Sequence, residues 1–143
     1  RRQRQMCIRD RHLYPYLKKS QGCIISILDI HANGKPFGDY TVYNMAKAAH
    51  QMMVQSLAIE LAPDIRVNGI APGINILPME GTEQALTAET IDKICHAVPL
   101  KRIGTPQDIA QVAVFLAAAP YITGQIIAVD GGRGLTLAGH ESR

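Results

Sequence analysis

The chain has 143 residues, 47% of them hydrophobic, and a formal net charge of +3. This length and composition fit one globular domain. No apolar run approaches the ~20 residues that a membrane-spanning helix needs, so we expect no membrane partner and a cytoplasmic protein. The three cysteines (Cys7, Cys23 and Cys95) lack the close spacing of metal ligands, so they predict free thiols and no metal site.

The positive charge is confined to the start of the chain. Residues 1–11 contain five arginines and one aspartate, a net charge of +4, and subtracting this from +3 leaves −1 for residues 12–143. A nearly neutral body does not predict nucleic-acid binding. A basic tail could bind RNA or acidic lipid, but residues 6–11 resemble translated sequencing-adapter sequence. We therefore expect residues 1–11 to be a non-native basic tail and residues 12–143 to form the domain.

The sequence of the first half of the domain predicts the end of a helix, then a strand and then a long helix. Residues 12–20 predict the last turns of a helix that carries Lys18 and Lys19 at its end, and cations are favourable at a helix C-terminus. Residues 23–28 form a short apolar run, typical of a strand buried on both faces. After a loop rich in Gly and Pro, apolar residues recur at helical spacing from residue 41 to about residue 61. The face that we expect this helix to bury consists of Val42, Ala46, Ala49, Met53 and Leu57.

The second half continues the alternation of strand and helix. Residues 65–70 predict a second strand, and residues 74–103 predict a long excursion with a short helix over 89–97. Thr105 and Asp108 predict a capped helix that runs to about residue 118, and residues 125–129 predict a third strand. Alternating strands and helices predict a parallel sheet with right-handed crossovers, and hence an α/β fold.

The most informative pair of residues is Tyr43 and Lys47, which lie four positions apart in the predicted helix. This spacing places the two side chains on the same helical face. A free tyrosine has a pKa near ~10, and a nearby cation favours the phenolate and lowers that pKa. The pair therefore predicts a phenol that relays protons near neutral pH.

Asp29 follows the first predicted strand directly. Ligands of open α/β sheets bind beyond the carboxyl ends of the strands. Asp29, the helix that carries Tyr43 and the turn over residues 71–73 all fall at or just after such ends. Their convergence predicts one site at this edge of the sheet, although Asp29 could equally be a turn cap.

From residue 12 to residue 134 the chain resembles the C-terminal half of a short-chain dehydrogenase/reductase. Four segments carry the resemblance, in order and at family-like spacing: Tyr43-x-x-x-Lys47, residues 65–73 (IRVNGIAPG), residues 99–108 (PLKRIGTPQD) and residues 122–132 (ITGQIIAVDGG). The resemblance implies the C-terminal half of a doubly wound, parallel-sheet fold of the Rossmann type. It also implies an NAD(P)H-dependent oxidoreductase that is a homotetramer when full length.

One position points further within the family. Most members carry serine where this chain has Asp29. Aspartate there, together with residues 40–47 (YTVYNMAK), resembles the pteridine reductases of bacterial type. That resemblance implies reduction of a pterin-like C=N bond, with aspartate and tyrosine as the proton donors.

The resemblance also assigns roles to individual residues. Asp29, Tyr43 and Lys47 are the expected catalytic residues, and Asp29 and His31 are expected at the substrate. The cofactor is expected to be NADPH, with NADH not excluded. Its expected contacts, besides Tyr43 and Lys47, are the backbone groups of Pro72, Gly73, Ile74 and Asn75.

The family's glycine-rich dinucleotide-binding turn is not found among these 143 residues. We therefore expect the 143 residues alone to bind NADPH weakly and to lack reductase activity. Two other functions stay open. One is a C=O reductase of the same family, such as a 3-oxoacyl carrier-protein reductase, and the other is an inactive truncated module that only forms oligomers.

Overall fold

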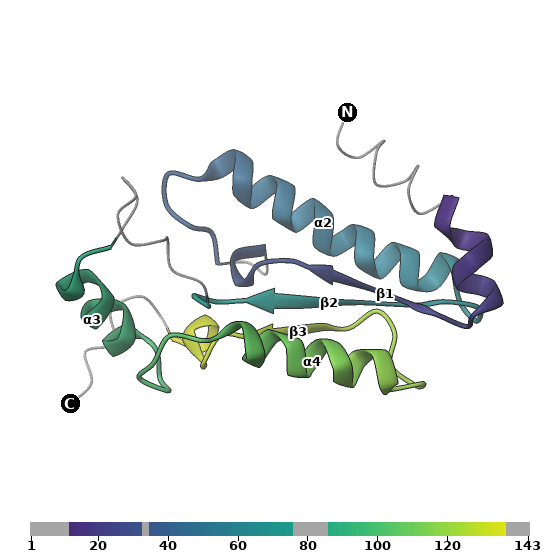
Figure 1. The fold of residues 1–143 in the computed structure, drawn as a ribbon. Helices are drawn as coiled ribbons and strands as arrows, with labels where there is room; N and C mark the ends of the chain where they lie inside the picture. The colour runs from purple at the N-terminus through teal and green to yellow at the C-terminus, as the bar shows by residue number, and fades with distance from the viewer. Residues whose placement is uncertain (1–11, 33–34, 76–85, 137–143) are drawn as a thin grey trace.

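A computed structural model describes residues 12–32, 35–75 and 86–136 (Figure 1). Their strands form a three-stranded parallel sheet in the order β1-β2-β3. Residues 12–19 are helical and precede β1. The remaining elements, in chain order, are β1 (Cys23–Ile27), the 3-10 helix η1 (Ile30–Ala32), α2 (Thr41–Glu60), β2 (Arg66–Pro72), α3 (Ala88–Ala97), α4 (Pro106–Ala118), β3 (Ile126–Val129) and the 3-10 helix η2 (Arg133–Leu135).

The sheet has helices on both faces, with α2 on one side and α4 on the other (Figure 1). The central strand β2 is therefore covered twice, and five of its seven residues are buried. Val67, Ile70 and Ala71 suit this position because both faces of the strand are covered. The buried Asn68 is accommodated because its side-chain amide donates to the Ile122 carbonyl and accepts from the N–H of Gln125. The predicted α/β fold with a parallel sheet is confirmed.

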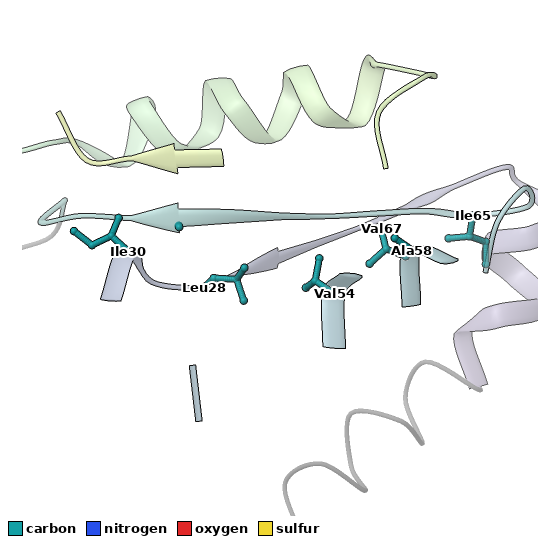
Figure 2. Close-up of a cluster of buried hydrophobic side chains, with 7 residues drawn as sticks. Leu28, Ile30, Val54, Ala58, Ile65 and Val67 are labelled. Carbon is teal, nitrogen blue, oxygen red and sulfur yellow. The ribbon is translucent and has the colours of Figure 1, made fainter. Parts of the chain in front are cut away.

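The main hydrophobic cluster lies between the sheet and α2 (Figure 2). Val54 and Ala58 of α2 meet Val67 of β2 and Leu28, which follows β1. Val54 and Val67 are fully buried. Burying a side chain of this size contributes about 1.5–3 kcal/mol, so this cluster fixes α2 against the strands whose ends carry the predicted site.

The apolar face predicted for α2 is wrong in its first half. Val42 is 81% exposed, and Ala46 and Ala49 are exposed as well. The helix buries Val54 and Ala58 instead. Because α2 is apolar around most of its circumference, periodicity alone does not select the arc that meets the sheet, and the packing partners decide it.

The start of α4 forms as its sequence predicts. Thr105 accepts a hydrogen bond from the backbone N–H of Asp108, and the Asp108 carboxylate accepts one from the N–H of Thr105. This reciprocal arrangement satisfies two N–H groups that lack helical partners. At the other end of the helix, Arg66 of β2 donates to the carbonyl oxygens of Leu116 and Ala117 at 2.7 and 2.8 Å.

Two sequence expectations concern residues outside the described ranges. They are the non-native tail over residues 1–11 and the part of the excursion over residues 76–85. Within the described ranges, the length and apolarity that a bilayer crossing requires are not combined in any helix.

Arg66→Met should destabilise the domain by about 1–3 kcal/mol, because it leaves the last carbonyl groups of α4 without their charged donor. Urea unfolding followed by circular dichroism measures the change. Lys93→Met is the matched control, since among the described residues Lys93 pairs with Glu89 on an exposed helical face and such pairs contribute little. Equal unfolding midpoints for the two variants would contradict the prediction.

Candidate active site

Asp29 is held at the end of β1 by the short helix that follows it. The backbone N–H of His31, in η1, donates to Asp29 Oδ1 at 2.8 Å. This contact is local, so the carboxylate is fixed by the chain immediately after it. The second carboxylate oxygen remains available to a group outside the turn.

The second carboxylate oxygen accepts a hydrogen bond from Tyr43. Its hydroxyl, on the first turn of α2, donates to Asp29 Oδ2 at 2.5 Å, a distance typical of a charge-assisted hydrogen bond. Tyr40, the other phenol near Lys47, precedes α2 and is 52% exposed. The structure therefore brings together Asp29 and Tyr43 from two elements, as the sequence predicts.

Lys47 lies beside Tyr43 without a hydrogen bond to its hydroxyl among the described contacts. Its Nζ donates to the carbonyl oxygen of Leu28 at 3.2 Å and lies 5.6 Å from the centre of the Tyr43 ring. An ammonium group has three donors, so two remain after this contact. Lys47 is thus anchored to the residue that precedes Asp29, close to both expected catalytic partners.

The expectation that Lys47 lowers the pKa of Tyr43 is wrong for this arrangement. Burial, together with the hydrogen bond and the negative charge of Asp29, raises the pKa of Tyr43 to about 12. Burial and a neighbouring carboxylate both disfavour the phenolate. The ammonium group of Lys47 faces the ring and a backbone carbonyl, so it does not reverse this effect. Tyr43 is therefore held as a protonated donor.

The β2 end lies beside Asp29 in the sheet. Ile27 of β1 pairs with Ile70 of β2, and Asp29 and Pro72 each follow two residues later at this edge of the sheet. Gly73 follows and packs so closely on Asp130 that an added Cβ would lie 2.7 Å from the Asp130 Cβ. The predicted cofactor contacts thus begin at the same edge of the sheet as the catalytic pair.

Ile74 and Asn75 turn away from β1 toward the α4 side. The Ile74 carbonyl accepts a hydrogen bond from the N–H of Gly104 at 3.0 Å. The Asn75 side chain is buried against Gly104, where an added Cβ would lie 2.0 Å from Asn75 Nδ2. Pro72 and Gly73 therefore border the catalytic edge, whereas the Asn75 side chain belongs to a different contact.

A row of aromatic rings leads away from Tyr43. The ring centres of His31 and Phe37 are 4.9 Å apart, those of Phe37 and Tyr40 are 4.9 Å apart, and those of Tyr40 and Tyr43 are 6.3 Å apart. Sequence reasoning selected His31 and Tyr43 but missed Phe37. The signal that could have found it is Asn44, whose side-chain amide bonds both the N–H and the carbonyl of Phe37.

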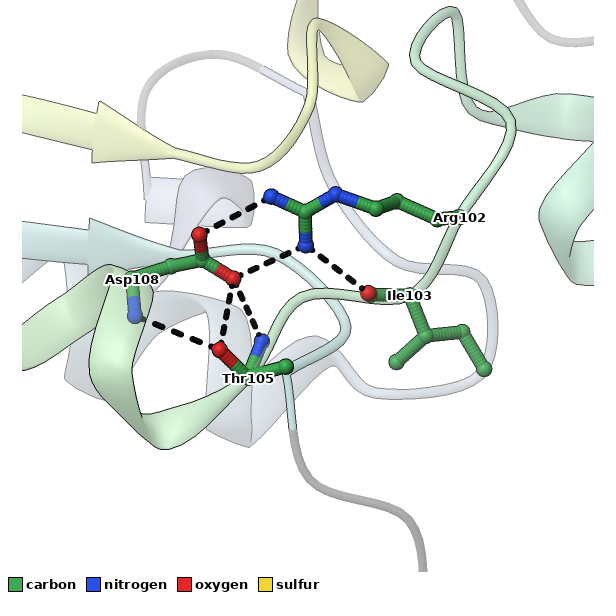
Figure 3. A network of polar contacts seen from close by, with 4 residues as sticks. All are labelled: Arg102, Ile103, Thr105 and Asp108. Atoms are coloured by element: carbon green, nitrogen blue, oxygen red, sulfur yellow. Dashed lines mark hydrogen bonds and ion pairs between the residues drawn. The ribbon is translucent and has the colours of Figure 1, made fainter.

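Arg102 forms an ion pair with the residue that caps α4. Its guanidinium binds both carboxylate oxygens of Asp108 at 2.9 Å (Figure 3). The hydrogen bonds from Arg102 and Thr105 hold the pKa of the Asp108 carboxyl well below its usual range. Asp108 thus joins the helix cap to the loop that precedes it.

Known proteins share this arrangement of elements and motifs. A family model described as enoyl-(acyl carrier protein) reductase matches residues 7–133. A crystal structure of a short-chain dehydrogenase/reductase from Caenorhabditis elegans is 30% identical, with a TM-score of 0.81 over 94% of this chain and 54% of that one. The chain belongs to the short-chain dehydrogenase/reductase family. Members of this family are oxidoreductases that use NAD(P)(H).

Curated members of the family with different substrates match about equally well. Pteridine reductase 1 of Leishmania tarentolae is 37% identical over 119 residues, which are 80% of this chain and 39% of that protein. The 3-oxoacyl-(acyl-carrier-protein) reductase of Buchnera aphidicola is 40% identical over 119 residues, which are 81% of this chain and 47% of that protein. The chain thus spans less than half the length of these relatives, and identity does not choose between their substrates.

Asp29→Asn should lower the pKa of Tyr43 from about 12 toward the ordinary value of about 10, because the substitution removes the negative charge beside the phenol. The absorbance of tyrosinate between pH 8 and 13, taken as the difference from Tyr43→Phe in each background, measures the change. Asp64→Asn is the control, since Asp64 accepts a hydrogen bond from a different phenol, Tyr14, at 3.3 Å. An unchanged Tyr43 titration in Asp29→Asn would contradict the assignment.

Proposed function

We propose that the protein containing this chain is an NADPH-dependent reductase of a pterin-type C=N bond. The hydrogen bond between Tyr43 and Asp29 at 2.5 Å carries the proposal. It couples a proton donor to a carboxylate at the sheet edge where ligands of this fold class bind. The resemblance of residues 40–47 to pteridine reductases supports the same substrate class.

The carboxylate favours a C=N substrate over a ketone. An ionised carboxylate only accepts hydrogen bonds, so it repels the lone pairs of a carbonyl oxygen. A dihydropterin instead presents ring N–H and amino groups, which such a carboxylate binds well. The imine nitrogen needs a proton when its carbon is reduced, and Tyr43, whose pKa is about 12, is a phenol that arrives at the substrate protonated.

The aromatic row supports a planar substrate. Phe37, Tyr40 and Tyr43 are each between 41% and 52% exposed, so their ring faces can accept a flat heteroaromatic ring by offset stacking. The two hydrogen bonds between the Asn44 side chain and the Phe37 backbone tie these rings to α2. A fatty acyl chain would gain less binding free energy from these rings, because it has no ring of its own to stack on them.

The residues present fit the donor set that NADPH requires. Lys47 keeps two N–H donors after its bond to Leu28, and ribose hydroxyls are suitable acceptors. When bound, NADPH supplies the hydride, while Tyr43 supplies the proton and Asp29 orients both the phenol and the substrate. The preference for NADPH over NADH and the homotetramer stay predictions.

The main competing activity is reduction of a 3-oxoacyl thioester. The Buchnera relative supports it through sequence identity alone. Asp29 opposes it, because the expected serine donor to a carbonyl oxygen is replaced by an acceptor. Both activities use the same hydride and the same phenol, so only the choice of substrate distinguishes them.

Tyr43→Phe should lower kcat for dihydropterin by about 10²–10⁴-fold in the intact protein, because the proton donor is lost. NADPH affinity, measured by fluorescence titration, should change little. Tyr40→Phe is the matched control and should keep kcat within a few-fold of the parent. A Tyr43→Phe variant with parental kcat would overturn the assignment of the proton donor.

Asp29→Ser should shift the preference of the intact protein from dihydropterin toward a 3-oxoacyl thioester. The ratio of the two kcat/KM values should change by at least tenfold, which corresponds to about 1.4 kcal/mol of differential transition-state binding. Asp64→Ser removes a carboxylate remote from Tyr43 and serves as the control. If the parent prefers the thioester, the pterin proposal fails while the reductase assignment stands.

A further inference from the structure

The loop over residues 35–40, which carries Phe37 and Tyr40 of the aromatic row, lies entirely on the surface. All six of its residues are exposed. Exposed side chains gain little free energy from burial, so hydrogen bonds from neighbouring elements must hold this loop in place. The groups that make those bonds therefore decide where the two rings lie relative to Tyr43.

Asn44, which follows Tyr43 on α2, bonds the loop at two points of one residue. Its Nδ2 donates to the Phe37 carbonyl oxygen at 2.8 Å, and its Oδ1 accepts from the Phe37 N–H at 3.2 Å. A side-chain amide contains both a donor and an acceptor, whereas a carboxylate only accepts and an ammonium only donates. The amide thus satisfies both backbone groups of Phe37 and fixes the position of its ring.

The other attachments of the loop consist of one hydrogen bond each. The His31 ring N–H at Nδ1 donates to the Lys35 carbonyl oxygen at 2.8 Å, since a carbonyl oxygen only accepts. The Tyr40 N–H donates to the Phe37 carbonyl oxygen at the longer distance of 3.4 Å. Tyr40 is the N-cap residue of α2, but within the described ranges its side chain forms no capping bond. The amide of Asn44 is therefore the main link between the loop and α2.

This link lies beside the proton donor without including it. The Tyr43 hydroxyl bonds Asp29, and its ring meets the Tyr40 ring edge to face, with their centres 6.3 Å apart. Loss of the Asn44 amide would release the loop but leave the bond between Tyr43 and Asp29 in place. Stacking of a flat substrate and proton transfer to it would then change separately.

We propose that Asn44 is a positioning residue, which holds the loop over residues 35–40 beside Tyr43 and thereby sets the affinity for a flat substrate. The identity of that substrate rests on the proposed function, whereas the attachment of the loop rests on the hydrogen bonds alone. Asn44 acts through Phe37 and Tyr40, whose rings stack on the substrate. Its effect therefore belongs to KM and not to kcat.

Asn44→Leu in the intact protein should raise KM for dihydropterin at least fivefold and keep kcat within threefold of the parent. The pKa of Tyr43 should stay at about 12, because its contact with Asp29 is retained. Gln111→Leu removes a similar amide from an exposed position of α4 and should leave both constants unchanged. A parental KM in Asn44→Leu, or a fall in kcat without a rise in KM, would overturn the proposal.

Asn44→Asp protects the test against misfolding of the leucine variant. A carboxylate near the start of a helix complements the helix dipole, so this variant should keep α2 intact. It accepts from the Phe37 N–H but cannot donate to the Phe37 carbonyl oxygen, so KM for dihydropterin should rise here as well. A folded Asn44→Asp variant with the parental KM would contradict the proposal.

Hydrogen exchange of the Phe37 backbone amide, followed by NMR without substrate, separates this proposal from the proposed function. Exchange should be at least fivefold faster in Asn44→Leu than in the parent, because the acceptor of this N–H is lost, and unchanged in Gln111→Leu. If the parent does not reduce dihydropterin, the proposed function fails, and faster exchange in Asn44→Leu still supports the attachment of the loop. Equal exchange in the parent and in Asn44→Leu would overturn it.

Discussion

The central position of β2 is the constraint on which the rest of the structure depends. This strand pairs with β1 on one side and with β3 on the other, and α2 and α4 cover its two faces. Its register with β1 pairs Ile70 with Ile27, two residues before Asp29, while Arg66 at its start fixes the last turn of α4. Both ends of the strand therefore position groups on neighbouring elements.

The protonation of the Tyr43 phenol follows from its burial and from the charged groups near it. Asp29 bonds the Tyr43 hydroxyl directly, whereas Lys47 bonds the Leu28 carbonyl and faces the ring. Burial of the phenol, the larger cause, and the direct contact with Asp29 together raise the pKa of Tyr43. A raised pKa keeps the Tyr43 phenol protonated at neutral pH, and the protonated phenol is the form that can donate a proton.

Sequence patterns predicted the strands, the helices and the pairing of Tyr43 with Asp29, because these features depend on local composition and on strand-end placement. The buried arc of α2 could not be predicted from periodicity, since apolar residues surround the helix. The direction of the Tyr43 pKa was also mispredicted. Spacing on one helix indicates that Lys47 is near, but only tertiary geometry shows that its ammonium group is directed elsewhere.

The anchor of Lys47 has a consequence for how such a site can evolve. Every residue type carries a backbone carbonyl, so substitution at Leu28 would leave the acceptor of the ammonium group in place. Asp29, by contrast, acts through its side chain and can be exchanged by a single substitution. Selection can therefore change the side chain proposed to meet the substrate while the cation beside it keeps its position.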